Sequence, residues 1–182
     1  IASGTPSGVI NLIIGVNPIT VVVTAPDSTT VQTYTIALTR RPWEGPFYVD
    51  QATGSDSNEC EAWGAGHACQ TIGGAIGKST QPGTYIYIAA GLYTENLTAT
   101  LPLNFVGAGA DNTIIDGNQA NRVLNITGAY SDVSLSDLTL RNGKITSGNG
   151  AGIYASAALP LANVNVFSNT TTSGNGGGVY AA

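Results

Sequence analysis

The sequence is poor in charged residues, which make up 9% of the chain, against about 25% in an average soluble domain. Its six basic residues form no cluster, and the formal net charge is −5. Nucleic-acid binding requires clustered positive charge that displaces counterions from phosphates, so this class of function is excluded. No apolar run approaches the about 20 residues of a transmembrane helix, so we expect no membrane span in this segment.

Cysteine is scarce as well. The chain has two, Cys60 and Cys69, separated by eight residues that include two glycines. Three interpretations fit: a disulfide, two free buried thiols, or a zinc site that uses His67 and lacks a fourth ligand. We predict the disulfide, which would stabilise the fold by roughly 2.5–3 kcal/mol. A disulfide implies an oxidising compartment, so we expect the protein to be extracellular, at the cell surface or secreted.

The chain is rich in glycine and contains a repeat. The segment "GNGAGIYA" at 148–155 returns as "GNGGGVYA" at 174–181, an offset of 26 residues. The repeated positions of most structural interest are Gly152 and Tyr154 in the first copy and Gly178 and Tyr180 in the second. The same offset places Leu138 on Val164, and "TIIDG" at 113–117 on "TLRNG" at 139–143. A fixed period of about 20–50 residues is typical of solenoids and other repeat arrays.

Short strands separated by turns occupy most of residues 47–182. This pattern fits a sandwich, a barrel or a β-solenoid, and the period favours the last, because a sandwich has no reason to repeat in sequence. In a parallel β-helix each coil lies about 4.8 Å from the previous one, so like side chains stack. Residues 70–78 have apolar side chains at helical spacing, with Thr71 as a cap, and predict a helix that covers the N-terminal end of the solenoid.

Residues 1–42 form a separate unit. Their alternating β-branched segments predict strands at 9–14, 18–25 and 31–39. Three strands of one sheet bury too little to be independently stable, so we expect the later part of a β-sandwich. The predicted fold class is therefore all-β: a partial β-sandwich (1–42) followed by a right-handed parallel β-helix (43–182) with a short N-terminal capping helix.

Two family resemblances follow from particular stretches. "GVINLIIGVNPITVVVTAPDSTTVQTYTIALTR" resembles the closing strands of the cadherin-like β-sandwich repeats of bacterial surface proteins. "FYVDQATGSDSNEC", "ACQTIGGAIG", "TYIYIAAGLYTENLT" and "LSDLTLRNG" together resemble the right-handed parallel β-helix domains of secreted bacterial proteins, polymorphic outer-membrane-protein-like and pectate-lyase-like. The second resemblance implies the fold rather than one activity, because that fold carries adhesins, passenger domains, lyases and hydrolases alike.

The period also sorts the carboxylates, because an offset of 26 places Asp111 on Asp137. Two stacked acids repel unless one is protonated or a cation lies between them. Sugar-cleaving enzymes use carboxylate pairs about 5–9.5 Å apart, which makes these two residues the catalytic candidates. The alternatives are turn capping by their own side chains and Ca²⁺ binding. The pectate-lyase resemblance implies a basic proton abstractor, but no motif assigns that role to Arg141 or Lys144.

A second acidic group lies in the loop "DQATGSDSNE" and consists of Asp50, Asp56 and Glu59. The loop lacks the ligand spacing of a Ca²⁺-binding loop. Together with Asp111 and Asp137, these residues are the metal-ligand candidates. Ca²⁺ is the only cofactor that the sequence suggests.

The expected function is that of a non-catalytic scaffold or adhesin module of a large secreted or cell-surface bacterial protein, binding glycans, surfaces or sister chains. One alternative is a polysaccharide lyase or glycoside hydrolase of the β-helix type. Another is a subunit of an extracellular filament. Stacked coils need a terminal cap, and none follows Ala182, so we expect a segment of a longer protein.

Overall fold

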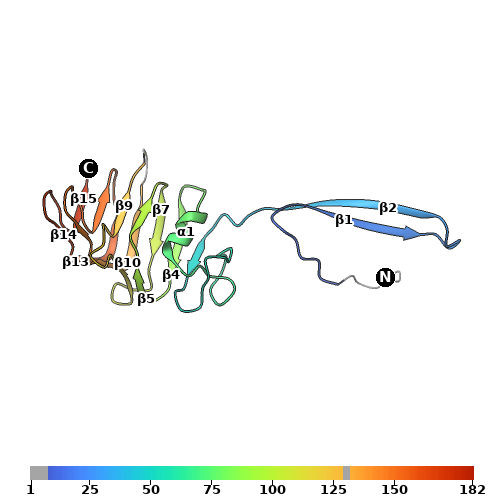
Figure 1. Ribbon diagram of the computed structural model, residues 1–182, viewed down its shortest axis with the longest axis horizontal. Coiled ribbons are helices and arrows are strands. Elements are labelled where there is room, and N and C mark those ends of the chain that lie inside the picture. The colour runs from blue at the N-terminus through green and yellow to red at the C-terminus, as the bar shows by residue number, and fades with distance from the viewer. Residues whose placement is uncertain (1–7, 129–131) are drawn as a thin grey trace. The chain divides into compact units, whose positions relative to one another are not determined.

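The computed structural model describes residues 8–128 and 132–182 and shows an all-β protein that contains one short helix (Figure 1). The chain divides into two compact units, Ile1–Pro42 and Trp43–Ala182. The second unit is a parallel β-solenoid of about three turns.

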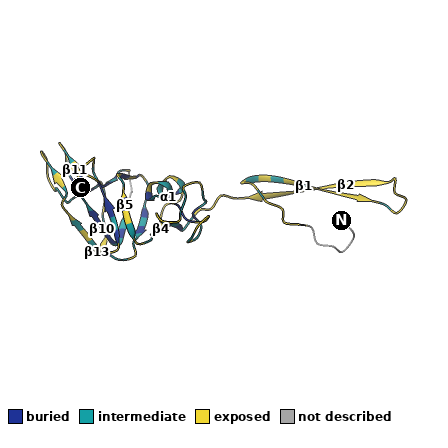
Figure 2. Ribbon diagram, turned by 60° about the horizontal axis from the view of Figure 1, so that its bottom comes forward, coloured by how far each residue is buried: buried dark blue, intermediate teal, exposed yellow. Residues whose placement is uncertain are grey.

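The first unit is a hairpin of two antiparallel strands, β1 (Gly15–Thr24) and β2 (Val31–Arg40). Asp27 stabilises its turn, because the carboxylate accepts hydrogen bonds from the backbone N–H groups of Thr29 and Thr30. Both faces of the hairpin are largely exposed (Figure 2). The strands predicted at 18–25 and 31–39 are confirmed, and their assignment to a cadherin-like β-sandwich remains a prediction.

The strand predicted at 9–14 is wrong, because regular strand structure in this part begins at Gly15. The side chain of Asn17 explains the difference. Its Oδ1 accepts a hydrogen bond from Ile13 N at 2.8 Å, and its Nδ2 donates to Ile13 O at 2.8 Å. The backbone N–H and C=O groups of Ile13 are therefore bonded to a side chain and not to another strand.

The solenoid contains two large sheets in which every pairing is parallel. The first runs in the order β3 (Phe47–Val49), β4 (Thr84–Ile88), β7 (Leu103–Val106), β10 (Ser134–Arg141), and also includes β13 (Leu161–Phe167), β8 (Thr113–Asp116) and β5 (Gly91–Thr94). The second runs in the order β6 (Leu97–Ala99), β9 (Leu124–Ile126), β12 (Ile153–Ala155), β15 (Val179–Ala181). Two short strands, β11 (Lys144–Ile145) and β14 (Thr170–Thr171), pair with each other. In the chain, β11 lies between β10 and β12, and β14 lies between β13 and β15.

The 26-residue period is confirmed for the last two coils. Tyr154 pairs with Tyr180, and their ring centroids are 5.7 Å apart with an interplanar angle of 11°. Leu138 pairs with Val164 at the same offset. These neighbours on adjacent coils show that the repeated segments stack directly on each other.

The same offset fails for the earlier coils. Arg141 pairs with Asp116, an offset of 25, so the alignment of 113–117 with 139–143 is wrong by one residue. Ile153 pairs with Leu124, an offset of 29. The strands stay paired from coil to coil, although the turns between them differ in length. The packing of the interior fixes which residues pair, but it does not fix the length of the turns.

The interior of the solenoid is apolar. Inward-facing side chains of successive strands are stacked by the pairing, and those of the first sheet are Phe47, Ile86, Phe105 and Leu135. Each is 1% exposed or less. Complete burial of one such side chain contributes about 1.5–3 kcal/mol, so this interior column provides much of the stability.

The predicted capping helix is confirmed as α1 (Ile72–Lys78). The Thr71 side chain accepts a hydrogen bond from Gly74 N at 2.9 Å, and Ile72 and Ala75 are buried. The helix contacts β3, β4 and β6 and so covers one end of the solenoid interior (Figure 1).

The predicted disulfide between Cys60 and Cys69 is confirmed, and both residues are fully buried. We expect Cys60→Ala/Cys69→Ala to lower the free energy of unfolding by roughly 2.5–3 kcal/mol, because the reduced chain regains the entropy of the open loop. Urea unfolding measures the difference. Dithiothreitol should lower the stability of the wild-type protein to that of the double variant and leave the variant unchanged. An unchanged wild-type midpoint in reductant would contradict the prediction.

Candidate functional site

The two carboxylates predicted to stack are not partners in the register. Ser136 pairs with Val106, so Asp137 follows beside Gly107, and its carbonyl accepts a hydrogen bond from Gly109 N at 3.0 Å. The strands β7 and β8 both pair with the single strand β10, so residues 107–112 form a loop that contains the exposed Asp111. The register that placed Asp111 on Asp137 is therefore wrong, because this loop adds residues on one coil only.

Asp137 lies inside β10 and interrupts the extended backbone of this strand. Its backbone has a φ of +57°, and its Oδ1 accepts a hydrogen bond from Asn163 Nδ2 at 2.8 Å. Asn163 is the residue 26 positions later and has a φ of +52°. Both residues thus occupy the same left-handed position on adjacent coils, where Asn and Asp are favoured, and a side-chain hydrogen bond links them.

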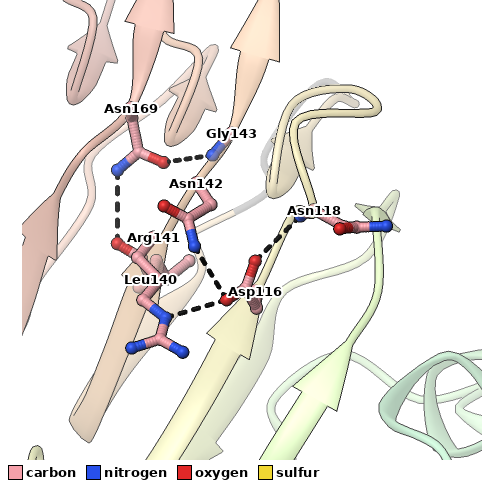
Figure 3. Close-up of polar contacts among 7 residues, drawn as sticks. All are labelled: Asp116, Asn118, Leu140, Arg141, Asn142, Gly143 and Asn169. Carbon is pink, nitrogen blue, oxygen red and sulfur yellow. Dashed lines mark hydrogen bonds and ion pairs between the residues drawn. The ribbon is translucent and has the colours of Figure 1, made fainter.

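The carboxylate of Asp116, at the end of β8, connects its own coil with the next one (Figure 3). Its Oδ2 accepts hydrogen bonds from Arg141 Nε and Asn142 Nδ2, each at 2.8 Å, and its Oδ1 accepts from Asn118 N at 2.9 Å. The residue is 8% exposed. The 26-residue period aligns Asp116 with Asn142, and these two side chains are in contact. The ion pair of Asp116 with Arg141 could not be predicted from that period, because the two residues pair at an offset of 25.

Two opposing effects act on the pKa of Asp116. Burial raises it, and the hydrogen bonds from Asn118, Arg141 and Asn142, together with the charge of Arg141, lower it. The second group of effects prevails, so the pKa lies below its ordinary value. The carboxylate is therefore charged at neutral pH and fully engaged in structural contacts.

Asn169 continues this network onto the next coil (Figure 3). Its Oδ1 accepts a hydrogen bond from Gly143 N at 2.6 Å, and its Nδ2 donates to Leu140 O at 3.2 Å. Beside it lies a hollow of about 290 Å³ whose polar lining residues are Gln119, Asn142, Lys144, Ser168 and Thr170. Amides and hydroxyls both donate and accept hydrogen bonds, so this polar hollow presents a surface suited to hydroxyl-rich partners.

The acidic loop after β3 is held together by its own carboxylates. Asp50 accepts hydrogen bonds from Ala52 N and from the hydroxyl of Thr53, and the Thr53 hydroxyl is the main cause of the lowered pKa of Asp50. Asp56 accepts from the backbone N–H groups of Gln70 and Thr71. Within residues 8–128 and 132–182, no three His, Cys, Asp or Glu side chains are grouped as metal ligands would be. The predicted metal candidates Asp50 and Asp56 thus act as caps of loops, whereas Glu59 remains a candidate by sequence alone.

Glu95 is a structural carboxylate that the sequence patterns did not reveal. It accepts hydrogen bonds from the backbone N–H groups of Ile72 and Gly73 at 2.9 and 2.8 Å. Burial raises the pKa of Glu95, although these N–H groups oppose the effect. These hydrogen bonds connect the first turn of α1 with the solenoid.

The repeated tyrosines are the middle residues of β12 and β15. The Arg122 guanidinium lies 5.1 Å from the ring centroid of Tyr154, a cation–π geometry. Arg122 also donates hydrogen bonds to the carbonyl oxygens of Asn149 and Gly150 in the next coil. These contacts join adjacent coils, so Tyr154 and Tyr180 belong to the scaffold.

A second cluster missed from sequence consists of four aromatic residues, Trp63, Tyr48, Tyr87 and Tyr85, here called the aromatic row. The ring centroids are 4.9 Å apart for Tyr48–Trp63, 5.5 Å for Tyr48–Tyr87 and 6.0 Å for Tyr85–Tyr87. Such pairs contribute about 0.5–1.5 kcal/mol beyond burial. The alternation in "FYV" and "TYIYI" was the available signal, because it places each tyrosine on the outer face.

No protein-family model matches the chain, and no curated protein matches it. Across the described residues, no helix has the length and apolar character required to cross a membrane. The fold itself defines the class, an all-β protein built on a parallel β-solenoid.

Proposed function

We propose that this chain is a non-catalytic module of a large secreted or cell-surface bacterial protein. Its solenoid serves as a rigid scaffold that presents polar and aromatic surfaces to glycans, to other surfaces or to sister chains. The disulfide supports an extracellular setting, because disulfides persist in oxidising compartments.

The observation that carries the proposal is the engagement of the carboxylates in the scaffold itself. Asp116 bonds three partners on its own and the next coil, Asp137 bonds the equivalent Asn163, and Asp50 and Asp56 hold loops. A glycoside hydrolase needs two carboxylates that face a scissile bond across a gap of about 5–9.5 Å. The two residues predicted for that role do not share a register position.

The coil-to-coil contacts explain how such a scaffold becomes stiff. Backbone ladders connect β9, β12 and β15, and a second ladder connects β10 with β13. The side chains of Asn169 and Arg122 bond backbone groups of adjacent coils. Bending the solenoid would stretch the hydrogen bonds on its convex side, so the stacked coils are expected to resist deformation.

An activity assay tests the non-catalytic assignment. The purified chain is incubated with polygalacturonate, xylan, β-glucan and chitin, with and without Ca²⁺, and both reducing ends and unsaturated uronate products are measured. We expect no release above that of the heat-denatured protein, while a known lyase releases product under the same conditions. Release that is linear in time and in protein concentration, and that is lost in Asp111→Asn or Asp137→Asn, would contradict the proposal and favour the enzyme alternative.

A further inference from the structure

The aromatic row lies on the outer face of β3 and β4. Along these strands Phe47, Val49, Ile86 and Ile88 point inward and are 1% exposed or less. The rings of the row occupy the alternate positions and the adjoining loop, and Trp63 and Tyr85 are each 48% exposed. The inward-facing residues already fill the interior of the solenoid. The rings of the aromatic row are therefore not part of that interior packing.

The row borders two shallow hollows of about 310 Å³ each. The proline-side hollow is lined by Pro46, Pro82, Tyr85 and Tyr87, among others. The tryptophan-side hollow is lined by Trp63 and Tyr87, with small residues that include Ala89 and Ala108. Tyr87 lines both, so its ring separates the two hollows, and each volume falls at the lower end of the about 300–1,000 Å³ typical of ligand sites.

The charge of this region restricts the ligand. Among the residues that line the two hollows, Glu44 alone carries a charge, and it is negative. The faces of aromatic rings also carry partial negative charge, which attracts polarised C–H groups. The formal net charge of the whole chain is −5, which repels polyanions. Negative ring faces and a single carboxylate are complementary to an uncharged ligand with positive C–H faces and hydroxyl donors.

We propose that the aromatic row binds a neutral glycan chain, with one pyranose in each hollow and Tyr87 between them. A pyranose offers a C–H face to an aromatic ring and carries hydroxyl groups around its edge. One of these hydroxyl groups donates a hydrogen bond to the carboxylate of Glu44. The hollows lie toward the two ends of β4, the proline-side hollow at residues 82–87 and the tryptophan-side hollow at residues 87–90, so a glycan that fills both passes over the outer face of this strand. This inference rests on the proposed function, in which the solenoid displays surfaces without cleaving what it binds.

The test is a binding measurement on the full chain. Retention is measured by affinity electrophoresis in gels that contain β-glucan, mannan or polygalacturonate, and by sedimentation with chitin or cellulose. We expect binding to at least one neutral glycan and at least tenfold weaker binding by Trp63→Ala/Tyr85→Ala. The control is Phe167→Ala, because Phe167 is also 48% exposed and lies on β13 of the same sheet but outside the row. Far-UV circular dichroism shows whether each variant keeps its fold.

A fluorescence titration keeps the test decisive if the double variant does not fold. The chain has two tryptophans, and Trp43 lies outside the row, where its Nε1 donates to Pro46 O. In Trp43→Phe, Trp63 is the only source of tryptophan emission. We expect a saturable change in that emission when soluble oligosaccharides of the bound glycan are added.

Each outcome has a separate meaning. No binding to any neutral glycan, binding to polygalacturonate alone, or an equal loss in Phe167→Ala overturns the inference and leaves the scaffold function standing. Binding of a proline-rich peptide in place of glycans overturns it as well, because such peptides also dock on aromatic surfaces. Binding followed by release of sugar products supports the binding site but overturns the non-catalytic function.

Discussion

Gly152→Ala is expected to lower the free energy of unfolding by about 2–3 kcal/mol, whereas Gly178→Ala changes it by about 1 kcal/mol at most. The two glycines occupy equivalent positions of the repeat, 26 residues apart. Their surroundings differ. A Cβ on Gly152 would overlap Gly178 O and would lie 2.7 Å from Asn169 Nδ2, whereas a Cβ on Gly178 would meet Val166 Cγ1 at an ordinary 3.6 Å.

The expected cost at Gly152 is larger than simple crowding because Asn169 joins two coils. Moving this side chain away from the added methyl group strains its hydrogen bonds to Gly143 N and Leu140 O (Figure 3). The backbone of Gly152 also cannot retreat freely, because its N–H donates to Gly177 O at 3.0 Å. The methyl group is thus enclosed by backbone on one side and by a bridging amide on the other.

Urea unfolding at 25 °C, followed by far-UV circular dichroism, measures both variants against the wild-type protein. Equal slopes of the free energy against urea concentration would show that the variants differ in stability alone. Equal losses for the two substitutions would contradict the explanation, because sequence equivalence rather than local contact would then determine the effect.

Asp116→Asn is expected to cost about 2–4 kcal/mol at pH 7, because it removes the negative charge from a buried ion pair. The amide has one acceptor oxygen in place of two, so either Asn118 N or the pair Arg141 Nε and Asn142 Nδ2 loses its acceptor. The side chain of Arg141 is 30% exposed, against 12% for Asp116. Partial hydration of Arg141 keeps the expected loss below the upper range for fully buried pairs.

The lowered pKa of Asp116 sets the pH dependence of this loss. Because the folded-state pKa lies below the ordinary aspartate value of 3.8, the stabilisation is complete above pH 3.8 and disappears as the pH falls through the folded-state pKa. The difference between the wild-type protein and Asp116→Asn should therefore narrow below about pH 3.8. Urea unfolding at several pH values between 7 and 2.5 measures it.

Asp111→Asn is the matched control for this prediction. Asp111 is an exposed carboxylate in the loop before β8, so we expect its substitution to change stability by no more than about 0.5 kcal/mol. A deficit in Asp116→Asn that persists unchanged to pH 2.5, or an equal loss in Asp111→Asn, would show that the ion pair is not the cause.

Several elements could be predicted because their signals lie within a short stretch of chain. Thr71 and the apolar spacing after it define α1, and the glycine-containing loop between Cys60 and Cys69 closes the disulfide. The last two coils could be placed because their turns have equal length and their sequences repeat. In each case the local structure that the segment favours by its own sequence is the structure that it adopts in the fold.

The failures have a common origin in turns and contacts that no period describes. The loop 107–112 lengthens one coil and separates Asp111 from Asp137, and the offset of 25 at β8 pairs Asp116 with Arg141. The side chain of Asn17 bonds the backbone of Ile13, within the segment predicted as a strand before β1. The aromatic row joins tyrosines of different strands with Trp63 of a separate loop. The alternation in "FYV" and "TYIYI" places the tyrosines on the outer face, but no regular pattern in the sequence indicates which of these side chains meet.

Local residue patterns alone thus determine that the chain forms short parallel strands in stacked coils, with a capping helix and a disulfide. The tertiary structure decides which carboxylates meet, which become structural acceptors, and where exposed rings gather beside hollows. The physical reason is that inward-facing apolar residues specify the pairing of strands, whereas the length of each turn is free to vary. Side chains outside the interior therefore acquire their neighbours only when the coils stack.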